Sequence, residues 1–145
     1  MKISTKGRYA LRMLIDLAEH QNCGYIPLGD IAKRQNISKK YLEQIIPILG
    51  GANILRTTRG AQGGYMLSRT PESYTVGEIL RLTEGSLSPL DDIRLTQGEY
   101  EETAEVVLMT VWQGLSRVVS QYLDSISLQD MVEMRQEQYM NNYMI

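Results

Sequence analysis

Cysteine, histidine and long apolar runs are scarce in this sequence. Its 145 residues include one cysteine, Cys23, and one histidine, His20. A single cysteine forms no disulfide within a chain, and two such ligands are too few for a tetrahedral structural zinc site. The longest apolar runs extend over a few residues, such as 106–109, whereas a bilayer-spanning helix needs about 20. These absences exclude a disulfide scaffold, a structural zinc domain and a transmembrane helix.

Residue sets that could carry out catalysis are also missing. The sequence offers no paired carboxylate site, no plausible triad and no metal-ligand set. His20 and Cys23 are close in sequence, but they fall where a predicted helix gives way to the polar turn HQNCGY, which is a poor place for a nucleophile and its base. We therefore predict that the chain is not an enzyme and binds no metal.

The composition is that of an ordinary folded domain, with 43% apolar and 22% charged residues. The first residues, MKISTKGRYA, carry three positive charges and no apolar stretch of signal-peptide length. We therefore expect a cytoplasmic protein that does not contact the membrane.

Charge is distributed unevenly along the chain. Residues 1–69 contain 11 Lys or Arg and 4 Asp or Glu, a net charge of +7, whereas the rest contains 4 basic and 13 acidic residues, a net charge of -9. A basic half beside an acidic half indicates that the first half meets a polyanion while the second has another role. An ordinary solvated surface is the alternative interpretation.

The period of the apolar residues predicts a mainly helical protein with one small hairpin. Helices are expected over about 5–21, 28–35, 38–49, 75–84, 99–125 and 128–134, and strands over 54–58 and 65–68. A polar and aromatic tail, EQYMNNYMI, follows the last helix. This pattern divides the chain into a first domain (1–85), an irregular linker (86–98), and a last unit of two helices with a tail (99–145).

The order of elements in the first half is typical of a winged helix-turn-helix. A short helix, a tight turn and a helix capped by Ser38 are followed by a hairpin with glycines at its tip. In such a unit the second of these helices enters the DNA major groove. Glu43 would accept a hydrogen bond from cytosine and so affect selectivity more than affinity. The candidate residues on this helix are Ser38, Lys39, Lys40, Tyr41, Glu43 and Gln44.

The hairpin tip carries Arg59 and Gly60, followed by further glycines that let a backbone approach a neighbouring surface closely. An arginine there could enter a minor groove. The alternatives are a plain turn and a nucleotide-binding loop, and the second is poorly supported because no GK[ST] sequence follows. Phosphate contacts are expected from Lys2, Lys6, Arg8 and Arg56.

Four segments, MKISTKGRYAL, YLEQII, RGAQGGYMLS and TVGEILRLTEG, resemble the Rrf-type regulators, which are IscR/CymR-like winged-helix transcription factors. The resemblance is close over about residues 1–90 and looser beyond. It implies a homodimeric repressor on a palindromic operator, with the long helix from about Glu99 packing against its partner. It also implies DNA contacts by Ser38, Tyr41, Glu43, Gln44 and Arg59.

Family members that resemble the iron-sulfur sensors carry three cysteines in the segment that here reads SLSPLDDIRLTQGEYEETA. This segment contains no cysteine, and Cys23 lies outside it. Thiolates are the usual ligands of these clusters. We therefore expect no iron-sulfur cluster and no other cofactor.

Cluster-free relatives include repressors of cysteine metabolism that sense sulfur status through the enzyme cysteine synthase. The acidic linker EGSLSPLDD and the tail residues Tyr143, Met144 and Ile145 look similar to that branch. A terminal isoleucine carboxylate suits capture in a backbone-lined pocket, which makes cysteine synthase a candidate partner. Alternatively, the tail packs on the dimer or frays. Two further hypotheses stay open, a module whose basic half binds an acidic protein, and a redox- or metabolite-responsive regulator of other genes.

Overall fold

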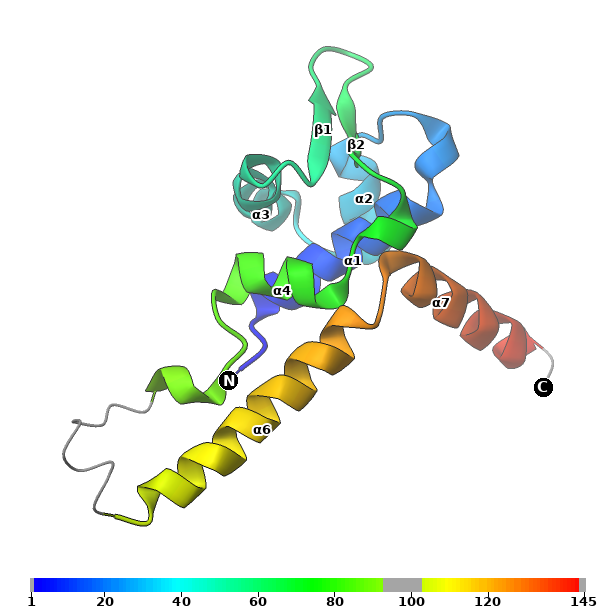
Figure 1. Ribbon diagram of the computed structural model, residues 1–145. Helices are drawn as coiled ribbons and strands as arrows, with labels where there is room; N and C mark the ends of the chain where they lie inside the picture. The colour runs from blue at the N-terminus through cyan, green and yellow to red at the C-terminus, as the bar shows by residue number, and fades with distance from the viewer. Residues whose placement is uncertain (1, 93–102, 144–145) are drawn as a thin grey trace.

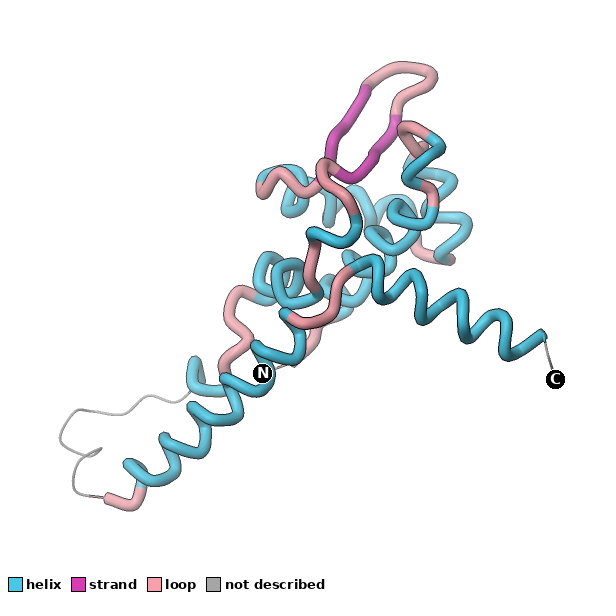
Figure 2. Tube along the Cα trace, turned by 45° about the vertical axis from the view of Figure 1, so that its right-hand side comes forward, coloured by secondary structure: helices cyan, strands magenta, loops and turns pink. Residues whose placement is uncertain are grey.

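The computed structural model describes residues 2–92 and 103–143, with a helical body, a projecting hairpin and two helices that diverge from the body (Figure 1). Figure 2 shows the same arrangement turned by 45°, with the hairpin at the top and the two diverging helices below. The helices are α1 (Thr5–Glu19), α2 (Leu28–Gln35), α3 (Lys39–Gly51), α4 (Val76–Glu84), α6 (Glu105–Asp124) and α7 (Leu128–Tyr143). The strands are β1 (Leu55–Thr58) and β2 (Gly64–Leu67), and short 3-10 helices cover Gln21–Cys23, Pro71–Ser73 and Pro89–Asp92.

Helix α1 is the centre of the body and packs against α2, α3, α4, α7 and β2. Its apolar residues recur every three or four positions, so one face is fully buried, at Ala10, Met13, Leu14 and Leu17. Ser4 caps the helix, because its Oγ accepts a hydrogen bond from the Gly7 backbone at 3.1 Å. The same hydroxyl donates to Glu84 Oε1 at 2.6 Å, which ties the start of α1 to the end of α4.

The helix-turn-helix is formed as the sequence predicts. Helix α2 ends at Asn36, which adopts the left-handed conformation with φ of 52°. Ile37 is buried under the turn. Ser38 then caps α3, because its Oγ accepts from the Tyr41 backbone at 3.1 Å. This geometry fixes the angle at which α3 leaves the turn.

The hairpin is held at its base by a third segment. Its strands pair antiparallel, with Leu55 opposite Leu67. Ile26 exchanges two backbone hydrogen bonds of 2.8 Å with Tyr65, which adds a one-residue third strand. The approach leaves no room for a side chain at Gly64, where a Cβ would lie 2.3 Å from the Ile26 carbonyl oxygen. Only glycine fits this position without moving the backbone.

The second half of the chain differs in two places from the prediction. Helix α6 begins at Glu105, directly after Ala104, and Thr103 Oγ1 accepts a hydrogen bond from the Glu105 backbone at 3.2 Å. Residues 99–102 of the predicted helix lie outside the described residues. Helix α7 continues to Tyr143, through most of the segment predicted as a tail. Ser127 and Asp130 form a capping box at its start, with hydrogen bonds of 2.9 and 3.0 Å.

The predicted linker is partly helical, because Pro89–Asp92 forms a short 3-10 helix, and its remainder over 93–98 lies outside the described residues. Helix α7 contributes Leu128 and Val132 to the core around α1. Over residues 2–92 and 103–143, no helix has the length and apolar character needed to span a membrane.

Candidate nucleic-acid interface

A groove of about 580 Å³ separates the start of α3 from the hairpin. Lys39 and Glu43 of α3 line it together with Arg59 and Gly60 of the hairpin tip. These four residues were singled out from the sequence, and the fold brings them to one concave surface. The start of α2 forms the floor, a contribution that sequence reasoning missed, through Pro27, Leu28 and Gly29.

The exposed face of α3 is the predicted one. Leu42, Ile45 and Leu49 are fully buried, so the opposite face is turned to solvent. Ile46, expected to point inward, is half-buried. Tyr41 is also half-buried, because its ring packs edge-on against Tyr9 with ring centroids 5.2 Å apart. The exposed candidate residues on this helix are Ser38, Lys39, Lys40, Glu43 and Gln44.

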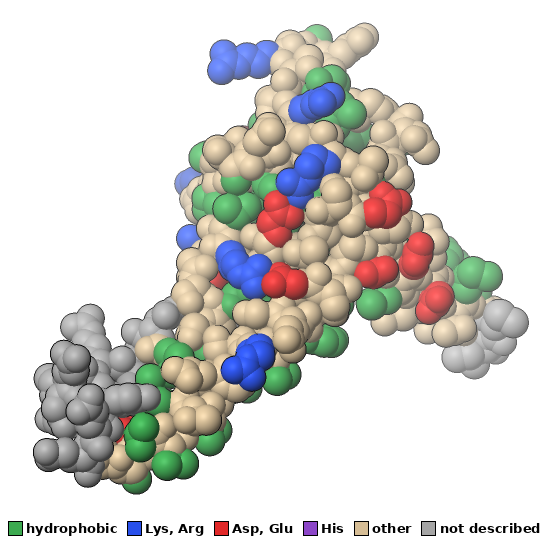
Figure 3. Space-filling view, in the orientation of Figure 1, with side chains coloured by type: hydrophobic (Ala, Val, Ile, Leu, Met, Phe, Trp, Pro, Cys, Tyr) green, Lys and Arg blue, Asp and Glu red, His purple; other side chains and the backbone are tan. Residues whose placement is uncertain are grey.

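The remaining basic candidates are exposed but do not line the groove. Arg56 lies on β1, and Lys2, Lys6 and Arg8 lie at the start of α1. Arg8 donates to Thr5 Oγ1 at 3.1 Å. On the face drawn in Figure 3, basic side chains lie over the hairpin and also over the body and α6, and acidic side chains gather over α7. The charge separation along the sequence is therefore only partly a separation in space.

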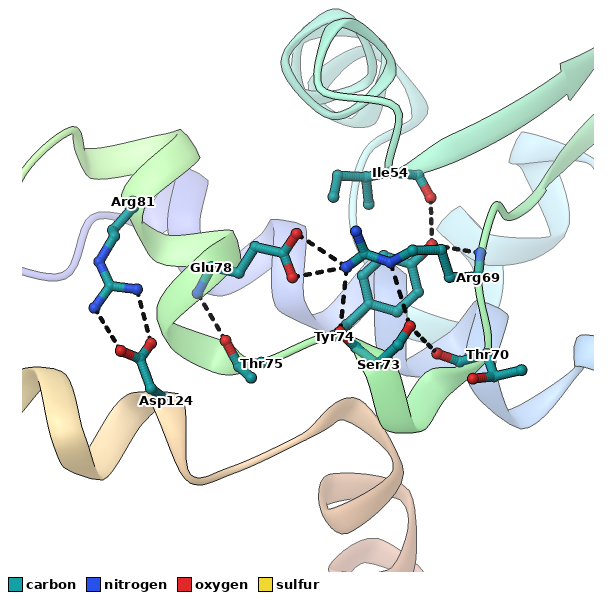
Figure 4. Close-up of polar contacts among 9 residues, drawn as sticks. All are labelled: Ile54, Arg69, Thr70, Ser73, Tyr74, Thr75, Glu78, Arg81 and Asp124. Atoms are coloured by element: carbon teal, nitrogen blue, oxygen red, sulfur yellow. Dashed lines mark hydrogen bonds and ion pairs between the residues drawn. The ribbon is translucent and has the colours of Figure 1, made fainter.

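The base of the hairpin is fastened by Tyr74, which is completely buried (Figure 4). Its hydroxyl donates to the Ile54 carbonyl at 2.9 Å and accepts from the Arg69 backbone at 2.8 Å. Ile54 immediately precedes β1, and Arg69 follows β2. One side chain therefore joins the feet of both strands. No local pattern in the sequence marked Tyr74 for this role.

The Arg69 side chain covers the Tyr74 ring at the base of the hairpin. Its guanidinium carbon lies 4.2 Å from the centre of the Tyr74 ring, and its Nη2 donates to both carboxylate oxygens of Glu78 at 2.9 and 2.8 Å. Because Glu78 belongs to α4, this ion pair ties the hairpin base to that helix.

A second ion pair ties α4 to α6, as Figure 4 also shows. Arg81 donates to the two carboxylate oxygens of Asp124 at 2.7 and 2.9 Å. These hydrogen bonds lower the pKa of Asp124 and raise the pKa of Arg81, while burial opposes both shifts. The ion pair thereby links the end of α6 to the body through α4.

His20 and Cys23, judged above a poor nucleophile-and-base pair, have separate surroundings. Nδ1 of His20 lies 2.7 Å from the backbone oxygen of Asp16, within its own helix end, and Cys23 is exposed. Within the part of the chain that the structure describes, no cluster of three or more His, Cys, Asp or Glu residues could hold a metal ion.

Comparisons with known proteins agree with this architecture. The family model Rrf2, described as an iron-dependent transcriptional regulator, matches residues 3–134. The transcriptional regulator CymR of Bacillus subtilis is 40% identical over 143 residues, which are 97% of this chain and 98% of that protein. IscR of Aliivibrio salmonicida is 33% identical over 132 residues, 91% of this chain and 77% of that protein. The solved structure of CymR, the global cysteine regulator of B. subtilis, superposes with a TM-score of 0.79 at 36% identity, covering 92% of this chain and 98% of that one.

The fold and these matches define a winged helix-turn-helix transcriptional regulator that binds DNA. The chain belongs to the Rrf2 family. Its fold class was predicted correctly from the sequence. Its relatives are named as regulators and not as enzymes, which also confirms the prediction that the chain has no enzyme activity.

The iron in the family description has no set of cysteine ligands in this sequence. Cys23 is the one cysteine of the whole sequence, and it lies exposed at the end of the short 3-10 helix Gln21–Cys23. A cluster held by several thiolates cannot be built from one. The donor set of this chain therefore does not suit an iron-sulfur cluster.

Proposed function

We propose that this protein is a repressor that occupies palindromic promoter sites as a homodimer. The observation that supports it best is the groove of about 580 Å³ lined by Lys39 and Glu43 from α3 and by Arg59 and Gly60 from the hairpin. A helix and a neighbouring hairpin tip fit the major groove and the adjacent minor groove of one DNA half-site. A protein that acts on chromosomal promoters works in the cytoplasm of a bacterium.

In the proposed complex, the start of α3 reads base edges. Gln44 can pair with adenine and Glu43 can accept from the amino group of cytosine, so these two residues set preference. Arg59 inserts into the minor groove, and Gly60 allows the backbone to come close to the sugars. The remaining candidates orient the protein through phosphate or sugar contacts, namely Lys2, Lys6, Arg8, Ser38, Lys39, Lys40, Tyr41 and Arg56.

The proposed dimer is formed through α6. No residue of this helix is buried in a single copy, although it carries apolar side chains along one face. Val118 and Tyr122 are 62% and 64% exposed. The exposed stripe recurs at steps of three and four, which is the spacing that packs helix against helix, at Val107, Val111, Leu115, Val118 and Tyr122. A second copy suits this stripe because palindromic DNA presents two half-sites related by a two-fold axis.

The proposed regulon is cysteine or sulfur metabolism, without an iron-sulfur cluster or other cofactor. Support comes from the relative titled the global cysteine regulator and from the single cysteine of this chain. We propose cysteine synthase as the partner, bound through the tail. Tyr143 is exposed at the end of α7, and Met144 and Ile145 lie outside the described residues.

Deleting Met144 and Ile145 tests this partner. The deletion should abolish co-purification of cysteine synthase while the free dimer keeps its affinity for DNA, because α3 and the hairpin are unchanged. If the shortened chain still retains the enzyme, the tail is not the contact.

The regulator as a whole is tested by capturing fragmented genomic DNA with the purified, metal-free protein and sequencing what is retained. The expected result is a shared palindrome upstream of sulfur-assimilation genes, bound with an affinity that falls steeply as salt rises. Retention of no preferred sequence, even at low salt, would contradict the proposal and favour a basic half that binds an acidic protein.

A further inference from the structure

The position of the hairpin tip depends on the tilt of the two strands at their base. Each strand has four residues, and a strand rises about 3.3 Å per residue, so the strands carry the tip about 13 Å from the base. A tilt of about 10° at the base then moves the end of the strands by about 2 Å, which is enough to break a hydrogen bond. Whatever fixes the base therefore decides whether Arg59 can reach its target.

The base is fixed by three side chains outside the hairpin strands. The Tyr74 hydroxyl bridges the Ile54 carbonyl before β1 and the Arg69 backbone after β2. Arg69 lies over the Tyr74 ring and is itself held by Glu78 of α4 through two hydrogen bonds of 2.9 and 2.8 Å. Arg69 Nη2 also donates to the Ser73 backbone oxygen at 3.2 Å. Both contacts to Glu78 come from Nη2, and Nε of Arg69 donates to Ser73 Oγ at 3.2 Å, so two nitrogens of the guanidinium are held.

We infer that Arg69, Tyr74 and Glu78 are positioning residues for DNA binding, which hold the hairpin at the tilt that brings Arg59 to the minor groove. This inference depends on the proposed contact between Arg59 and DNA and adds the residues that place it. None of the three belongs to the groove-lining set, and they act through the base of the hairpin.

For Glu78, the inference predicts a change in DNA affinity opposite to the one that charge alone predicts. Removing a carboxylate from a DNA-binding protein ordinarily strengthens binding, because repulsion from the phosphates falls. If Glu78 positions the hairpin, its replacement by glutamine weakens binding instead. A loss of affinity on losing a negative charge is not expected from a merely electrostatic role.

The experiment compares four full-length variants on the captured palindromic DNA at fixed salt, namely E78Q, R59A, the double variant R59A/E78Q, and the control E19Q. Glu19 also forms an ion pair, with Arg135 at 2.6 Å, but this pair joins α1 to α7 and not the hairpin base to α4. E19Q therefore matches the change in charge and the loss of a surface ion pair.

E78Q is expected to bind DNA about fivefold more weakly than the unchanged protein, whereas E19Q binds equally well or more tightly. In the R59A background E78Q should have no further effect, because there is no arginine left to position. Tyr74→Phe should weaken binding in the same direction and lose its effect in the same background. Thermal unfolding of E78Q should stay close to that of E19Q, since both ion pairs are partly exposed.

The outcomes distinguish the contact of Arg59 with DNA from the positioning role of Glu78. If R59A weakens binding and E78Q behaves like E19Q, the positioning role is wrong while the proposed function stands. If E78Q weakens binding equally with and without Arg59, the effect does not pass through the hairpin tip and the inference is again wrong. If R59A leaves affinity unchanged, both the minor-groove contact and the positioning role are wrong.

Discussion

Arg34 donates two hydrogen bonds, of 2.9 and 2.7 Å, to the carboxylate of Asp16, a side chain that is only 1% exposed. Gln35 adds a third at 3.0 Å. The hydrogen bonds between Arg34 and Asp16 raise the pKa of the Arg34 guanidinium, and burial acts in the opposite direction. Asp16 belongs to α1 and Arg34 to α2, so this cluster sets the position of the helix-turn-helix on the central helix.

Replacing Asp16 by alanine should lower the free energy of unfolding by about 2 kcal/mol, because the substitution leaves buried donors without an acceptor. Arg34 is 38% exposed and can turn to water, which keeps the loss below that of a fully buried pair. Urea denaturation measures the change. The control is Glu19→Gln on the same helix, where an exposed pair should cost at most about 0.5 kcal/mol. Equal losses in the two variants would contradict the structural role of Asp16.

Gly64→Ala should destabilise the protein by about 2 kcal/mol, since the new Cβ would lie 2.3 Å from the Ile26 carbonyl oxygen and force the backbone apart. Gly50→Ala provides the matched control, because a Cβ there has no neighbour within 4 Å and alanine favours a helix. Thermal unfolding should show a lower midpoint for the first and an unchanged or higher one for the second. A tolerated alanine at position 64 would show that the third segment is not tightly held.

Arg59→Ala should weaken binding to the operator by about 1–3 kcal/mol and reduce the dependence of affinity on salt, if the side chain is inserted in a groove. Fluorescence anisotropy with a labelled half-site pair measures both. Lys33→Ala is a suitable comparison, because Lys33 is an exposed basic residue of α2 outside the groove-lining set. Identical affinities for the Arg59 variant and the unchanged protein would mean that the Arg59 side chain does not contact the DNA.

Glu43→Ala should leave affinity unchanged or raise it, while relaxing base preference at one position of each half-site, because a carboxylate among phosphates selects more than it attracts. Selection from a randomised operator library measures the preference. A collapse of affinity with an unchanged preference would mean that Glu43 has a structural role in the groove.

Val118→Asp should convert the dimer to monomers, because a charge placed in an apolar helix interface is left without a partner. Gln113→Asp adds the same charge to an exposed position on another face of α6 and should leave the dimer intact. Sedimentation velocity across a dilution series distinguishes them. If both variants sediment alike, the exposed stripe of α6 is not the dimer contact.

Local patterns were enough to predict the helix-turn-helix and its hairpin. The Ser38 cap, the apolar period of α3 and the glycines of the tip each act over a few residues, so they can be recognised along the chain. The exposed face of α3 followed from the same period.

Contacts between distant segments could not be predicted in this way. Asp16 meets Arg34 from another helix, and Tyr74 reaches the Ile54 backbone across the hairpin base. Neither pair has a spacing that marks it. The extension of α7 was missed for a different reason, because its last turns are exposed and bury no apolar face. The helix there depends on residue propensity and on local contacts such as that between the rings of Tyr139 and Tyr143, whose centroids are 4.7 Å apart.

The one-residue bridge between Ile26 and Tyr65, together with the Tyr74 hydroxyl, holds the hairpin from below. Residues 59–62 at the tip are exposed and lie beyond all of these contacts. The residues that orient the hairpin are therefore different from the residues exposed at its tip. Under the proposed contact of Arg59 with the minor groove, tip sequences of equal length that keep Gly60, whose φ is 109°, are expected to change groove preference while the strands keep their direction.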